Sequence, residues 1–81
     1  MKYAIRIANA PFPVWVEAIY PELVGKKRSL TGLGVSYFYT DSPRHATLYN
    51  TMEVVIELKT MKDPTEVITE DELQVYVIMD E

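Results

Sequence analysis

Apolar and polar residues alternate with a period of two in several short stretches of the chain, which is the pattern of half-buried β-strands. Residues 3–8 show this alternation first, and residues 14–20 show it again after two prolines in the segment 9–13. Proline cannot donate a ladder hydrogen bond, so the break between the two stretches predicts a turn. We therefore expect residues 3–20 to form a β-hairpin.

A third strand and one short helix are predicted in the middle of the chain. Residues 35–40 are rich in aromatic side chains and are expected to form the strand. Ser42 then stands where a helix N-cap is preferred, and Pro43 stands at the first helical position. Asp41 adds a favourable negative charge near that end. The pattern predicts a helix over residues 43–49, which is short enough to depend on packing.

Two further strands are predicted in the second half. Residues 53–59 alternate between apolar and charged side chains, and residues 62–64 have the composition of a turn. Residues 69–72 have the spacing of a helix capping box, or form a tight turn. The apolar stretch 73–79 is then expected to be the last strand. Residues 22–34, which hold the glycines and a basic run, are predicted to form a loop.

These elements predict one α+β domain over residues 1–81, with a small, mainly antiparallel sheet of about five strands and one short helix, in the order ββ-loop-β-α-β-β. A chain of this length buries only about 60–65% of its unfolded surface, so its core is small. The chain has no cysteine and one histidine, which excludes disulfides, thiolate-held zinc and His-rich metal sites. We expect no cofactor and no metal.

The sequence also predicts a cytoplasmic protein. No apolar run approaches the roughly 20 residues that span a bilayer. Arg6 interrupts the first apolar stretch, which then continues into strand pattern, so a signal peptide is not expected either.

Charge is distributed unevenly along the chain, whose net charge is −4. Residues 1–52 carry six basic and three acidic side chains, a balance of +3, and residues 53–81 carry two basic and nine acidic ones, a balance of −7. An acidic surface repels phosphate backbones and favours basic partners. We therefore do not expect nucleic acid as a partner, although the same charge also serves solubility.

The polar clusters match no catalytic or metal-binding motif. The basic run 26–28 lacks the glycine spacing of a phosphate-binding loop, so it is interpreted as a solvated loop tip or as a contact to an acidic or phosphate-bearing surface. His45 is the one side chain with a near-neutral ordinary pKa, but Ser42 beside it is better explained as a helix cap than as a nucleophile. The acidic residues near the C-terminus have no glycine of the kind that calcium loops require. We assign no catalytic residue and expect a protein that is not an enzyme.

Aromatic residues indicate a function more clearly than the polar clusters do, because they are concentrated in the first half of the chain. One short helix covers only one face of a small sheet, so rings on the other face are expected to meet a loop, a second subunit or a partner. Tyrosine and tryptophan are enriched at the centres of protein interfaces. We therefore interpret three aromatic residues as contact anchors and five acidic residues as steering charges: Trp15, Tyr37 and Tyr39, and Glu53, Glu57, Glu70, Asp71 and Glu72.

Residues 1–8, with their Met-Lys-Tyr-Ala-Ile opening, and residues 35–58, with an aromatic-Thr-Asp-x-x-x-x-Ala box followed by a charged valine-rich stretch, resemble small accessory proteins of bacteriophages and prophages of low-GC Gram-positive bacteria. The resemblance implies a role in the bacterial host's cytoplasm, where such proteins often bind and inhibit a host protein, including defence nucleases. It supplies no functional residue. Our leading hypothesis is a non-enzymatic protein-binding module. The alternatives are a structural homodimer or virion-associated protein, and a weak nucleic-acid binder acting through the basic loop at 26–28.

Overall fold

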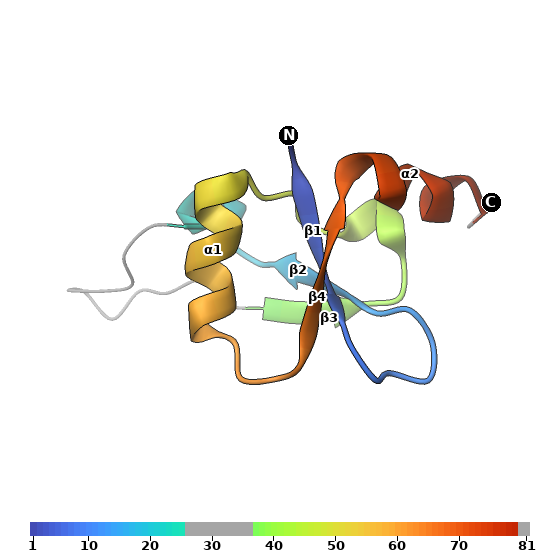
Figure 1. The fold of residues 1–81 in the computed structure, drawn as a ribbon, viewed down its shortest axis with the longest axis horizontal. Coiled ribbons are helices and arrows are strands. Elements are labelled where there is room, and N and C mark those ends of the chain that lie inside the picture. Colours follow the sequence, from blue (N-terminus) through green and yellow to red (C-terminus); the bar gives the residue numbers. More distant parts are fainter. Residues whose placement is uncertain (26–36, 80–81) are drawn as a thin grey trace.

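The computed structural model describes residues 1–25 and 37–79. In this part of the chain, four strands form one antiparallel sheet in the order β3-β2-β1-β4. Two α-helices lie on opposite sides of that sheet (Figure 1). Single 3-10 turns, η1 and η2, follow β2 and β3. The elements are β1 (Tyr3–Ile7), β2 (Trp15–Ala18), η1 (Pro21–Leu23), β3 (Tyr37–Thr40), η2 (Pro43–His45), α1 (Thr51–Thr60), β4 (Thr65–Thr69) and α2 (Glu70–Met79).

The α+β class with a small antiparallel sheet is confirmed, and so is the N-terminal hairpin. Arg6 of β1 lies opposite Trp15 of β2, and Asn9 in the turn between them takes a positive φ of 65°. Asparagine tolerates this left-handed conformation better than most residues. The strand predicted at 35–40 is present as β3, which pairs with β2, and its first two residues lie outside the described part of the chain.

The helix predicted over residues 43–49 is wrong. η2 is a single 3-10 turn, and the Ser42 side chain caps no backbone N–H there. The segment beyond it, residues 46–49, is not helical, because its polar groups bond to two strands of the sheet. Thr47 N–H donates to the Val16 carbonyl at 3.1 Å, and the Thr47 hydroxyl accepts from Ala18 N–H at 2.8 Å. Tyr49 exchanges two backbone hydrogen bonds with Tyr3 of β1, of 2.7 and 2.8 Å. These long-range bonds outweigh a helix of two turns.

The strand predicted at 53–59 is also wrong, because this stretch lies within α1. Asn50 supplies the N-cap: its side chain accepts from Glu53 N–H at 2.8 Å, and the Glu53 carboxylate accepts from Asn50 N–H at 2.7 Å. This reciprocal capping box satisfies two backbone donors that a helix start otherwise leaves unpaired. The alternating residues Val54 and Leu58 are four apart, so they share a helix face as readily as a strand face. Both pack into the core beneath α1.

The C-terminal stretch differs in the same way. Thr69 Oγ1 accepts from Glu72 N–H at 3.2 Å, so the capping spacing at 69–72 begins α2, and the strand predicted at 73–79 is a helix. The residues just before it form β4, which the sequence pattern did not reveal. β4 pairs with β1 from Tyr3 opposite Thr69 to Ile7 opposite Thr65. The predicted turn at 62–64 is the connection from α1 into this strand.

Each face of the sheet carries its own core. Neighbouring residues of β1 point to opposite faces, so that Ile5 packs beneath α1 and Ala4 packs beneath α2. The expectation that a single helix leaves one sheet face open is therefore wrong. The buried members of the two clusters are Ile5, Val16, Ala18, Val24, Tyr49 and Val54 on the α1 side, and Ala4, Trp15, Ile68 and Leu73 on the α2 side.

The predicted loop over residues 22–34 lies largely outside the described part of the chain, but its first residues are held by α1. Gly25 N–H donates to Glu57 Oε1 at 2.9 Å. Gly25 has a φ of +78°, and a Cβ at this position would lie 2.6 Å from Glu53 Cγ. Glycine is therefore required here, both by the backbone conformation and by the close approach of α1.

We predict that Asn50→Ala destabilises the protein by about 1 kcal/mol, because it removes the side-chain half of the capping box that begins α1. Urea unfolding monitored by circular dichroism measures this change. Ser42→Ala is the matched control, since Ser42 is the other residue with a capping signature but caps nothing. It should change the free energy of unfolding by less than about 0.5 kcal/mol. The reverse order of the two effects would contradict this assignment of the helix start.

Candidate functional site

The structure separates the three residues interpreted as aromatic anchors. Trp15 is only 2% exposed and packs beneath α2, so it is a core residue of the described fold. Its indole Nε1 is buried without a hydrogen-bond acceptor among the described residues, so ring burial rather than polar bonding holds it. Tyr37 and Tyr39 pair with Ala18 and Val16, which places both on the α1 side of the sheet. Tyr37 is half-buried there, and Tyr39 is exposed.

The acidic residues are separated as well. Glu53 is part of the α1 capping box, and Glu57 is 1% exposed beneath the same helix, where it accepts from Gly25. Neither has the free surface position that a steering charge needs. The other three predicted residues form the first turn of α2, where negative charge is favourable next to the helix N-terminus: Glu70, Asp71 and Glu72.

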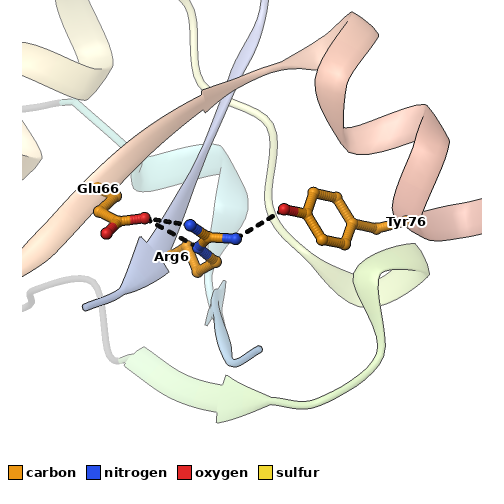
Figure 2. Close-up of polar contacts among 3 residues, drawn as sticks. All are labelled: Arg6, Glu66 and Tyr76. Atoms are coloured by element: carbon orange, nitrogen blue, oxygen red, sulfur yellow. Dashed lines mark hydrogen bonds and ion pairs between the residues drawn. The ribbon is translucent and has the colours of Figure 1, made fainter. Parts of the chain in front are cut away.

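Three residues that the sequence reasoning did not select join α2 to the sheet: Arg6, Glu66 and Tyr76. Arg6 Nη1 donates to Tyr76 Oη at 2.8 Å, and Arg6 Nε donates to Glu66 Oε2 at 3.1 Å (Figure 2). A second contact from the Arg6 Nη2 to the same Glu66 oxygen makes the ion pair two-pronged. The hydrogen bond to Glu66 is the main cause that raises the pKa of Arg6 above its ordinary value. The group therefore links β1, β4 and α2 (Figure 2).

Tyr76 is also the contact through which α2 covers Trp15. The two rings meet edge to face, with centroids 5.3 Å apart and an interplanar angle of 70°. The Arg6 guanidinium carbon lies 5.7 Å from the centroid of the Tyr76 ring, within cation–π range. An arginine inside an apolar strand was the signal in the sequence that could have revealed this contact.

The outer face of α2, which we define as Val75, Ile78 and Met79, is apolar and open to solvent. These side chains are 56%, 70% and 78% exposed. Their spacing of three and four residues places them on one side of the helix, opposite the buried Leu73. Asp71 lies one turn before Val75 on the same side. The helix thus buries one apolar stripe and exposes another.

A hollow of about 400 Å³ adjoins this outer face. It lies between α2, η2 and the connection from β1 to β2, and Met79 belongs both to its wall and to the outer face. Phe12, which is exposed, stands at the side formed by the connection. The other residues lining the hollow are Pro13, Trp15, Asp41, Pro43 and Tyr76.

Other candidate chemistry finds little support in the geometry. His45 is exposed, and its Nδ1 lies 3.9 Å from Glu17 Oε2. Within residues 1–25 and 37–79, no three His, Cys, Asp or Glu side chains gather as metal ligands would.

No helix in the same part of the chain is both long and apolar enough to cross a membrane. The basic run at 26–28 lies outside the described residues.

Comparison of the chain with models of known protein families, with curated proteins and with solved structures gives no match.

A separate contact gives Tyr39 a defined pH behaviour. The Tyr39 hydroxyl donates to Asp63 Oδ2 at 3.0 Å, and this hydrogen bond, followed by partial burial, raises the pKa of Tyr39 above its ordinary value of 10. The stabilisation belongs to the protonated phenol. It is therefore fully present below about pH 10 and is lost as the pH rises through the raised pKa.

We predict that Asp63→Ala lowers the pKa of Tyr39 towards 10, because the variant removes both the acceptor and its negative charge. Titration of the tyrosine ¹³Cζ resonances by NMR measures the effect, and Tyr39→Phe assigns the resonance. The other tyrosine resonances serve as the internal control and should keep their titration curves. An unchanged Tyr39 curve in Asp63→Ala would show that the bond is absent in solution.

Proposed function

We propose that this chain is a non-enzymatic protein-binding module that docks onto its partner through the outer face of α2. The observation that carries the proposal is the exposure of Val75, Ile78 and Met79 on a helix whose opposite side is already packed. Full burial of one such side chain contributes about 1.5–3 kcal/mol, and the fold gains only the smaller part of it here, because more than half of each side chain stays exposed. A contiguous apolar patch of this kind is typical of a protein interaction site.

The rigid attachment of α2 supports the same proposal. Leu73 is buried beneath the helix, and Tyr76 is held by Trp15 and Arg6. A helix fixed at these points presents its outer face in one orientation, so a partner does not have to order it on binding. Such preorganisation lowers the entropic cost of association.

Charge supports a partner other than a second copy. Asp71 and Glu72 are exposed beside the outer face, and the whole chain carries a net charge of −4. Two copies repel each other over long range, whereas a basic protein is attracted. Inhibition of a host protein, which the resemblance to phage accessory proteins implies, stays a prediction within this proposal.

Affinity capture from a bacterial lysate tests the proposal with one variant and one matched control. Ile78→Asp places a charge at the centre of the outer face, and Met52→Asp places the same charge on α1 at a residue that is 76% exposed. We expect Ile78→Asp to weaken retention of a captured protein at least tenfold, and Met52→Asp to leave it unchanged. Circular dichroism establishes that both variants are folded.

Two results would contradict the proposal. Equal retention by Ile78→Asp and the unmodified chain would show that the outer face of α2 is not the docking surface. Light scattering that shows a dimer, dissociated by Ile78→Asp but not by Met52→Asp, would assign this face to self-association and would favour the structural alternative.

A further inference from the structure

The hollow beside α2 combines aromatic walls with a single charge. Phe12 and Tyr76 bring two aromatic rings to it, Trp15 adds only the small part of its ring that is not buried, and Met79 adds a long flexible apolar side chain. Asp41 is the only charged side chain among the described residues that line it. A hollow bounded by aromatic rings and one carboxylate has the composition of a cation-binding site, since aromatic faces attract positive charge.

The carboxylate of Asp41 has no ion-pair partner within the described part of the chain. Asp41 is also exposed. The guanidinium of Arg6, which contacts Tyr76, is paired with Glu66. The contact of Arg6 with the Tyr76 ring also shows that this ring accommodates a guanidinium within 6 Å.

We infer that this hollow receives a lysine or arginine side chain of the partner protein. The inference rests on the proposed function, because Met79 belongs both to the hollow and to the outer face of α2. Lysine and arginine carry an apolar stem below a charged head. The stem lies against Phe12 and Met79, and the head pairs with Asp41. The partner surface therefore has a basic residue next to an apolar patch.

Other occupants fit the same walls less well. A purely apolar side chain would bury the Asp41 carboxylate without a partner, which costs free energy. An acidic side chain would meet a like charge at Asp41. A basic side chain satisfies the carboxylate and the aromatic rings together.

Selection from a displayed library of random 12-residue peptides tests the inference without a known partner. The folded chain is the bait, and dissociation constants of selected peptides are measured by the fluorescence of Trp15, the only tryptophan in the sequence. We expect lysine or arginine next to apolar residues in the selected peptides. Replacing that basic residue by alanine should weaken binding to the unmodified chain at least tenfold.

A double-mutant cycle locates the cation. Asp41→Asn keeps the size of the side chain and removes its charge, and Asp63→Asn is the matched control on the opposite, α1 side of the sheet. We expect Asp41→Asn to weaken peptide binding about tenfold and Asp63→Asn to leave it unchanged. In Asp41→Asn, replacing the peptide's basic residue should cost less than threefold, because its partner is already lost.

The outcomes separate this inference from the proposed function. Peptides that lose binding to Ile78→Asp but respond equally to their basic-to-alanine change in the unmodified chain and in Asp41→Asn would overturn the cation site alone. Peptides that bind Ile78→Asp and Asp41→Asn without loss, or a selection that enriches nothing, would count against both. Choline that displaces the peptides at micromolar concentration would assign the hollow to a small amine and overturn the inference of a protein side chain.

Discussion

The whole structure depends on β1, because this one strand contributes to every layer of the protein. It pairs with β2 on one side and with β4 on the other, and its alternating side chains enter both cores. Ile5 faces α1, Ala4 faces α2, and Arg6 fixes α2 through Tyr76. A chain of 81 residues has too little apolar surface for thick layers. Burying both faces of one central strand is how this chain obtains two cores from a small sheet.

The sequence predicted best those parts that depend on local chemistry alone. The hairpin follows from alternation and two prolines, and the class and small antiparallel sheet follow from it. The two helices also had local signals: Asn50 precedes Glu53, and Thr69 precedes Glu72, each at capping-box spacing. β-Branched residues such as Val54 gave a competing strand pattern, and a pair four residues apart fits both periods. The capping residues decide between the helix and the strand. Each pairs with backbone N–H groups that are left unpaired at the start of a helix but not in a paired strand.

The segment after η2 could not have been predicted in this way. Ser42 and Pro43 have the local preferences of a helix start, yet the backbone of Thr47 and Tyr49 bonds to β2 and β1. Those strands are about 30 to 45 residues away in the sequence, so these hydrogen bonds could not be predicted from the local pattern of residues. The same limit applies to the candidate site. Trp15 was selected for its residue type, but its burial depends on Tyr76, which only the helical form of 73–79 brings above it.

The second apolar stripe of α2 joins stability to the proposed binding role. A ten-residue helix is marginal in isolation, so α2 persists because Leu73 and Tyr76 hold its inner side. Most of the hydrophobic surface on its outer side stays in water and does not stabilise the isolated fold. A partner that covers this side binds only the folded chain, and at a free concentration a hundred times its dissociation constant it stabilises that state by about 2.7 kcal/mol. That gain is a substantial fraction of the roughly 5–15 kcal/mol by which domains are stable. Under the proposed docking role, the cost of leaving Val75, Ile78 and Met79 in water would be recovered on binding, which would be a physical reason for keeping an apolar face on an otherwise anchored helix.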